Sequence, residues 1–222
     1  SQRTKNIERQ LLVKNPASFY LSESGKKLAA NPHDLETIML LKKRGVPIPK
    51  TFFPVSRNRD QLTNTVQKLG GFPIILKVLG GSHGVGVMRI DSFPSLFSVI
   101  DLLETRGIAP LILRQYIDVD RSARLIVLGN HVIDSIEYVA PANDFRSNVG
   151  AVPNIRPRHF SDDIGRTAIR ATTALGWEFG GVDILFDDKG NHYVTEVNFP
   201  CFFPRCQLAT GVDIAGQMVD YL

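Results

Sequence analysis

The segment 182–198 carries two carboxylates and an amide that a hairpin would bring together. Two apolar, β-branched runs flank a cluster of turn residues, which predicts a β-hairpin. With Lys189-Gly190 as a two-residue turn, Asp183 lies opposite Glu196, and Asn198 shares the face of Glu196 because side chains alternate along a strand. Opposed like charges destabilise a sheet, and an all-oxygen set suits Mg²⁺ or Mn²⁺. We predict a divalent-cation site. The alternatives are a solvated hairpin whose acids share no role, and a different loop length that shifts the register.

A glycine-rich stretch at 80–86 lies between two apolar runs and indicates a second kind of chemistry. Glycines at this density let backbone amides approach a phosphate chain closely. No helix follows, so this is neither a Walker loop nor a dinucleotide fingerprint. Lys77 lies mid-strand among apolar residues, where its ammonium is costly to bury without an anion. The pattern predicts a flap over phosphates; the alternative is an ordinary hairpin with a snorkelling lysine. The flap candidates are Gly81, Ser82, His83 and Gly84, and for His83 an exposed loop position without contacts is equally compatible.

The order of the motifs resembles the ATP-grasp ligases, and is most similar to their RimK-like branch. In chain order the motifs are Lys77, the glycine flap, Gln115-Tyr116-Ile117, Asp144 to Asn148, Gly181 to Leu185, Glu196 to Asn198, and Thr210 to Gly216. The resemblance covers roughly residues 31 to 222. The string Asp-Phe-Arg-Ser-Asn is specific to the RimK-like branch, whereas glycine flaps and metal hairpins occur across the superfamily.

The resemblance implies an α+β fold, the ATP-grasp fold, in which two α+β lobes clamp the nucleotide. The mixed order of helices, strands and hairpins also favours α+β. We expect lobe 1 at about 46–117 and lobe 2 at about 118–222, within an ATP-grasp domain spanning 31–222. Residues 1–30 would then be the end of a missing preceding domain. Capping and periodicity predict helices from Asn31 to Gly45 and at 60–69, 94–104, 161–175 and from 213, and strands at 111–117, 124–128 and 131–138.

The implied activity is ATP-dependent joining of an amino acid or other amine to an acceptor carboxylate through an acyl phosphate. ATP and Mg²⁺ (or Mn²⁺) are the implied cofactors. Arg124 and Arg146 would act catalytically, as guanidinium forks for phosphate or the acyl phosphate. The implied nucleotide contacts are Lys77, the flap, Gln115, Tyr116, Ile117, Arg146, Ser147 and Asn148. The alternative function is a catalytically silent ATP-binding module that regulates or scaffolds a partner.

The chain departs from the RimK-like pattern in four places. Asp34, Gln115 and Ser122 replace an expected lysine, acid and aspartate, which puts the strength of ATP binding in doubt. The loop after the metal hairpin, usually built of small residues, is instead aromatic, which puts the substrate in doubt. We expect Phe199, Phe202 and Arg205 to contact the substrate, with the guanidinium holding a carboxylate. The alternative is that these aromatics pack beneath the terminal helix.

Composition limits the partners. The chain has 222 residues and is 43% hydrophobic, which is enough to bury a core. Its formal net charge of +4 makes it mildly basic. Lys and Arg are dispersed, which argues against nucleic acid, and no apolar run approaches the roughly 20 residues that span a bilayer. The two cysteines form no disulfide framework, so a cytoplasmic setting is the default. We expect ATP and a small-molecule or peptide carboxylate as partners, with a homo-oligomer left open.

Overall fold

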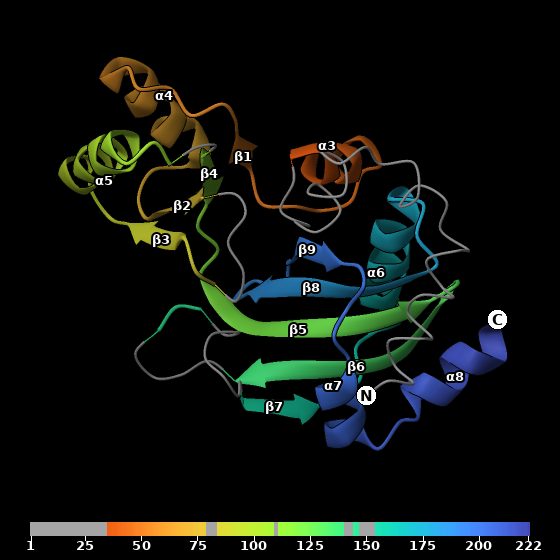
Figure 1. The fold of residues 1–222 in the computed structure, drawn as a ribbon. Helices are drawn as coiled ribbons and strands as arrows, with labels where there is room; N and C mark the ends of the chain where they lie inside the picture. The colour runs from red at the N-terminus through yellow and green to blue at the C-terminus, as the bar shows by residue number, and fades with distance from the viewer. Residues whose placement is uncertain (1–34, 79–83, 109–110, 140–143, 147–153) are drawn as a thin grey trace. The chain divides into compact units, whose positions relative to one another are not determined.

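The computed structural model describes residues 35–78, 84–108, 111–139, 144–146 and 154–222. The chain divides into two compact units, one formed by residues 49–118 and the other by residues up to 48 together with 119–222. Each unit combines an antiparallel sheet with helices (Figure 1), so the predicted α+β class is confirmed. Among the described residues, no helix has the length and apolar character that crossing a membrane requires.

The smaller unit is a four-stranded sheet in the order β1-β4-β2-β3, with two helices. Its elements are β1 (Thr51–Phe52), α4 (Arg59–Leu69), β2 (Ile74–Val78), β3 (Val87–Ile90), α5 (Phe93–Thr105) and β4 (Leu111–Gln115). Asn58 caps α4 by accepting hydrogen bonds from two backbone amides, and Ser92 caps α5 by accepting one from the amide of Ser95. Apolar residues from both helices and the sheet, including Leu62, Leu96 and Leu76, form one core. The helices predicted at 60–69 and 94–104 are confirmed to within a residue at each end.

The larger unit is a five-stranded sheet in the order β7-β6-β5-β8-β9, with every neighbouring pair antiparallel. Its strands are β5 (Val119–Leu128), β6 (His131–Val139), β7 (Asn154–Pro157), β8 (Phe179–Asp187) and β9 (His192–Asn198). Its helices are α3 (Leu35–Lys43), α6 (Asp162–Ala174), α7 (Pro204–Thr210) and α8 (Ile214–Tyr221). In Figure 1, β5 lies in the middle of this sheet between β6 and β8, and β7 lies at one edge.

The larger sheet is buried on both faces, and alternation along β5 separates the two cores. Leu125 and Val127 pack with residues of α3 and α6, whereas Ile126 and Leu128 pack with residues of α7 and α8. Arg124 alternates with Leu125 and therefore belongs to the face of Ile126. The core that Ile126 and Leu128 share with α7 and α8 also includes the segment after β9. This core holds that segment against the sheet, beside the predicted cation site.

Three elements were not expected from the sequence: the two-residue strand β1, the strand β7 and the helix α7. β7 is a short, mostly exposed edge strand, without the alternation that would reveal it. The helix α7 begins at Pro204, inside the predicted substrate loop, because proline's fixed backbone angle suits a first helical turn. The start of the helix predicted from Asn31 lies outside the described residues, which begin at Leu35.

Candidate functional site

The β8–β9 hairpin brings together the predicted cation ligands. Asp183 pairs directly with Glu196, as predicted, and Gly181 pairs with Asn198. The predicted two-residue turn is wrong, however. The amide of Asp187 donates to the carbonyl of Asn191 at 3.0 Å, so three residues make the connection. Near the turn the register is therefore shifted by one, and a bulge between Asp183 and Ile184 restores it.

Arg124 continues this row of charges onto a third strand. It pairs with Asp183 across β5 and β8, and the two side chains form a bidentate ion pair. Nε of Arg124 donates to Oδ1 of Asp183 at 2.7 Å, and Nη2 donates to Oδ2 at 2.7 Å. The side chains are 18% and 10% exposed, respectively. Burial acts to lower the pKa of Arg124, but the charge and hydrogen bonds of Asp183 outweigh it and hold that pKa well above the usual value.

Two further residues position Arg124: Tyr138, which belongs to no motif of the sequence, and Gly181, which opens the motif Gly181 to Leu185. The guanidinium carbon lies 5.9 Å from the centre of the Tyr138 ring, a cation–π arrangement. Gly181 leaves room beneath: a Cβ there would lie 2.9 Å from Cβ of Cys201 and 3.4 Å from Cδ of Arg124. A glycine inside a strand is typical of such a close approach, and this was the one available signal.

The donor set fits a hard divalent cation. Asp183 accepts three hydrogen bonds, the third from Nδ2 of Asn198 at 3.2 Å, and a carboxylate has about four acceptor positions. With its amide nitrogen towards Asp183, Asn198 directs its oxygen away from that carboxylate. Glu196 adds a second carboxylate across the strand pair. The described residues contain no cluster of three or more His, Cys, Asp or Glu side chains, so two carboxylates and an amide are the set to consider.

Arg146, the other predicted catalytic arginine, is held locally in the described structure. Its guanidinium makes a bidentate ion pair with Asp144, with Nε to Oδ1 at 3.0 Å and Nη2 to Oδ2 at 2.8 Å. The hydrogen bonds from Arg146 lower the pKa of Asp144. The pair fixes the direction of the guanidinium. Ser147 and Asn148, predicted beside it, lie outside the described residues.

In the smaller unit, Lys77 lies within β2 between the neighbouring residues Val87 on β3 and Ile112 on β4. Its exposed fraction is 8%, so the predicted burial is confirmed. Gly84 and Gly86 both have positive φ, and the carbonyl of Gly86 accepts from the amide of Val78 at 2.9 Å, which closes the hairpin. Of the predicted flap, Gly81, Ser82 and His83 lie outside the described residues.

The predicted nucleotide contacts Gln115, Tyr116 and Ile117 begin at the last residue of β4. The backbone amide of Gln115 donates to the carbonyl of Lys50 at 2.8 Å, and the side-chain oxygen of Gln115 accepts from the amide of Lys50 at 3.4 Å. The guanidinium of Arg89 lies 4.8 Å from the Tyr116 ring centre, and Ile117 is 6% exposed. Backbone and side-chain contacts within the smaller unit therefore hold this segment in place.

The predicted substrate loop divides into buried and exposed residues. Phe199 is buried and packs 5.3 Å from the ring of Trp177, and Phe203 is buried with its ring edge-on to Phe179. For these two residues the packing alternative holds. Phe202 is 65% exposed and Arg205 is exposed at the first turn of α7. Only these two predicted substrate residues present side chains to solvent.

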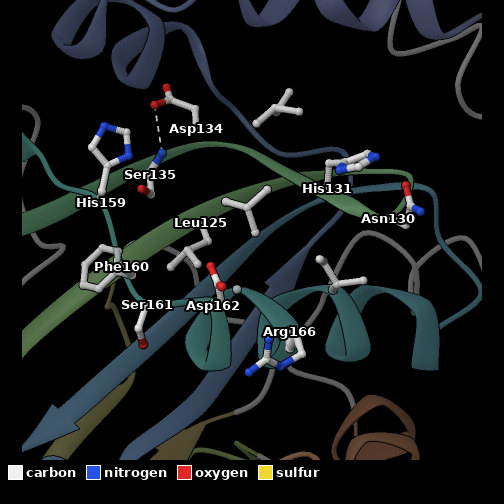
Figure 2. A pocket seen from close by; sticks show the side chains of 14 residues that line it. Leu125, Asn130, His131, Asp134, Ser135, His159, Phe160, Ser161, Asp162 and Arg166 are labelled. Carbon is white, nitrogen blue, oxygen red and sulfur yellow. Dashed lines mark hydrogen bonds between the residues drawn. The ribbon is translucent and has the colours of Figure 1, made fainter.

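A separate pocket of about 380 Å³ lies elsewhere in the larger unit. Figure 2 shows it between β6, the segment 159–162 and α6, with Leu125 at its base and His131, His159 and Arg166 around it. Leu125 belongs to the face of β5 opposite to Arg124. None of the residues predicted for catalysis, nucleotide, metal or substrate lines this pocket.

Comparisons with known proteins agree with these features. The chain is 34% identical over 196 residues to the ribosomal protein bS6–L-glutamate ligases of Salmonella paratyphi B and Salmonella newport, covering 85% of this chain and 62% of each relative. The chain thus spans 62% of the length of these relatives. The ATP-grasp ligase PsnB, solved with a minimal precursor, is similar with a TM-score of 0.69 and 24% identity, covering 87% of this chain and 61% of that one.

The D-alanine–D-alanine ligase from Bacillus anthracis has a TM-score of 0.62 at 18% identity, covering 83% of this chain and 64% of that one. At such identities, structural likeness shows the fold. The predicted ATP-grasp fold is therefore confirmed. The family profile of the RimK-like ATP-grasp domain matches residues 32–222, nearly the whole of the predicted domain. The chain belongs to the RimK-like ATP-grasp family.

Proposed function

We propose that the chain is the ATP-grasp part of an ATP-dependent ligase that joins an amino acid or other amine to an acceptor carboxylate through an acyl phosphate. The observation that carries the proposal is the row of Arg124, Asp183 and Glu196 across three adjacent strands, with Asn198 beside it. Such a row combines hard oxygen ligands with a guanidinium, as phosphoryl transfer requires. Family membership and the named glutamate ligase relatives support the same activity.

The roles of the residues follow from their chemistry. Asp183, Glu196 and Asn198 would hold Mg²⁺, which supplies charge neutralisation for the phosphates of ATP. Lys77, buried in β2, would pair with a phosphate, and its low exposure makes an anionic partner the favoured reason for its position. The backbone of Gln115 to Ile117 would contact the adenine. Arg146, aimed by Asp144, would stabilise the charge that develops on the acyl phosphate.

The acceptor that we propose is a peptide or protein carboxylate. The relatives are named for a ribosomal protein, and the PsnB structures are described with a precursor peptide. In this chain, exposed Phe202 and Arg205 at the start of α7 offer one apolar and one cationic contact. The guanidinium of Arg205 suits an acidic side chain or chain terminus on a peptide, and Phe202 suits an apolar one. Cys201 and Cys206 are both reduced, which fits the cytoplasm as the compartment.

The second candidate is an ATP-binding module without turnover. It is favoured by the departures at Gln115 and Ser122, where the family pattern has acids. Ser122 is 4% exposed within β5, so it offers little surface to a nucleotide. The cation ligands and Lys77 remain in place, which favours the ligase.

The deciding experiment incubates the protein with ATP, Mg²⁺, pooled amino acids and cell extract, and follows phosphate release and new amide masses. New amides in the wild type and none in Glu196→Gln would support the ligase. Tight ATP binding without amide formation under every mixture would overturn it and support the binding module. Asp188→Asn, an exposed change on the turn of the same hairpin, is the matched control and should retain turnover.

A further inference from the structure

One carboxylate of the proposed cation site already has a cationic partner. Both oxygens of Asp183 accept hydrogen bonds from Arg124, each at 2.7 Å, and Oδ2 also accepts from Asn198. The guanidinium is planar and permanently charged, so it carries its charge at every physiological pH. A cation arriving at Asp183 therefore meets a carboxylate that is largely saturated with donors.

The position of this ion pair sets it apart from an ordinary strand-to-strand bridge. Asp183 faces Arg124 on one neighbouring strand and Glu196 on the other, so the row reads positive, negative, negative. Without Arg124, two carboxylates would oppose each other at a partly buried place, which is unfavourable. Counting the three charges, Arg124 changes the net charge of the row from −2 to −1. The positive charge of Arg124 therefore weakens the attraction of these two carboxylates for a free divalent cation.

The packing keeps the guanidinium in that place. Tyr138 lies over it, and the missing side chain at Gly181 makes room for its stem and for Cys201. The Tyr138 phenol is neutral at physiological pH, so the ring adds no competing charge. An arginine that only linked β5 to β8 by an ion pair would not need the Tyr138 ring over its guanidinium. It would also not need the second carboxylate, that of Glu196, in the same row.

We propose that Arg124 is a built-in counter-cation that makes divalent-cation binding depend on the nucleotide. The inference rests on the proposed function, because it takes Asp183, Glu196 and Asn198 as the cation ligands. A free cation binds weakly because it is repelled by Arg124 and must share Asp183 with it. A polyphosphate brings negative charge that attracts both the cation and the guanidinium. Cation and nucleotide therefore bind cooperatively, and each raises the affinity for the other by the same factor.

The test measures Mn²⁺ binding to the nucleotide-free protein by electron paramagnetic resonance, and ADP binding with Mn²⁺ or with chelator. We expect Arg124→Gln to bind Mn²⁺ alone at least about tenfold more tightly than the wild type, a change of about 1.4 kcal/mol. The ratio of ADP affinities with and without Mn²⁺ should fall in the same variant. Its metal-free form should melt at a lower temperature and regain stability with Mn²⁺ alone.

Two further variants separate charge from packing. Arg124→Lys keeps the positive charge without the fork, so its Mn²⁺ affinity should stay near the wild-type value. Arg121→Gln removes one charge from the same strand, but Arg121 contacts the ring of Phe186, so it should leave Mn²⁺ affinity unchanged. If Arg124→Lys and Arg124→Gln bind Mn²⁺ equally tightly, packing and not charge is responsible, and the counter-cation role is overturned.

The wild type alone also tests the inference, whether or not Arg124→Gln folds. Because the coupling is reciprocal, wild-type protein that binds Mn²⁺ equally well with and without ADP would also show ADP binding that is independent of Mn²⁺, and this outcome would overturn the inference. If only the inference fails, ADP binding should still depend on Mn²⁺ in the wild type, and Glu196→Gln should abolish that dependence. Wild-type protein whose ADP binding never depends on Mn²⁺ would overturn both the inference and the cation site of the proposed function.

Discussion

Asp183 on β8 lies directly opposite Glu196 on β9, although the turn that joins these strands is one residue longer than a two-residue turn. Thr195 is the extra residue of β9 that compensates, since Ile184 pairs with Val194 while Asp183 pairs with Glu196. The hydroxyl of Thr195 donates to the carbonyl of Asp183 at 3.3 Å. A bulge of this kind re-aims the residues that follow it, here the two predicted cation ligands of β9.

The first prediction concerns the link between metal and nucleotide. Mg²⁺ with ATP should raise the melting temperature by mass action, and ATP with chelator should do much less. Glu196→Gln should remove most of that difference, because it deletes one ligand charge while keeping the shape. Differential scanning fluorimetry measures the shift, with Asp188→Asn on the turn as the control. A full Mg²⁺-dependent shift in Glu196→Gln would place the metal elsewhere.

The second prediction concerns the buried lysine of the smaller unit. Lys77→Ala should weaken ATP binding by roughly 10- to 150-fold, since a charge-assisted hydrogen bond to phosphate contributes about 1.5–3 kcal/mol. Isothermal titration calorimetry gives the affinity, and circular dichroism checks the fold. Lys68→Ala, at an exposed position of α4, should bind ATP like the wild type. Equal affinities for both variants would exclude Lys77 from the ATP site.

The third prediction compares two glycines of the larger unit. Gly181→Ala should destabilise the fold by about 1–3 kcal/mol, because its Cβ would lie 2.9 Å from Cβ of Cys201. Gly165→Ala, inside α6, meets only Cγ2 of Val132 at 3.6 Å, so it should stabilise by about 0.4–1 kcal/mol. Urea unfolding of both variants gives the two signs. A stable Gly181→Ala would mean that the segment after β9 adjusts freely.

The fourth prediction separates packing from specificity in the segment 199–205. Phe203→Ala should lower the free energy of unfolding by about 3–5 kcal/mol, since its side chain is 1% exposed. Phe202→Gly should leave a folded protein that accepts a wider range of acceptors. Arg205→Ala should raise the acceptor KM with nearly unchanged ATP affinity. Steady-state kinetics with acidic and neutral acceptor peptides provide the comparison, and unaltered acceptor KM values would assign specificity to other residues.

The fifth prediction is a pH dependence at the edge of the larger sheet. Burial acts to raise the pKa of Glu137, but hydrogen bonds from Arg156 and Arg158 outweigh it, so the pKa is lowered. A lowered pKa stabilises the fold above the unfolded-state value near 4.3, and this stabilisation is lost as the pH falls through the folded-state value. Urea unfolding between pH 6 and pH 3 should show a smaller loss in Glu137→Gln than in the wild type. Parallel pH profiles would exclude this ion-paired cluster as a source of acid sensitivity.

Much of the fold could be predicted because local patterns and tertiary packing agree. The helices at 60–69 and 94–104 have caps, periodic apolar faces and glycine or polar stops, and the structure keeps all of them. The strand pair around Gly129-Asn130 likewise follows from its turn and alternation. By contrast, α7 was not predicted, since its seven residues follow an irregular aromatic run and are fixed by contacts with the sheet core.

For the site, the sequence determined which residues are available and that Asp183 and Glu196 share a strand pair. The order of motifs was enough for the family, and the apolar run around Lys77 was enough to predict its burial. Only the tertiary structure decided how the hairpin turn and the bulge at Thr195 cancel, because hydrogen-bond register depends on backbone conformations that residue types do not specify. It also decided that Arg124 is paired with Asp183, since that contact joins residues 59 positions apart and depends on the order of strands in the sheet. The chemistry of a side chain is set by its residue type, whereas the partner of a buried charge is set by which strands lie side by side.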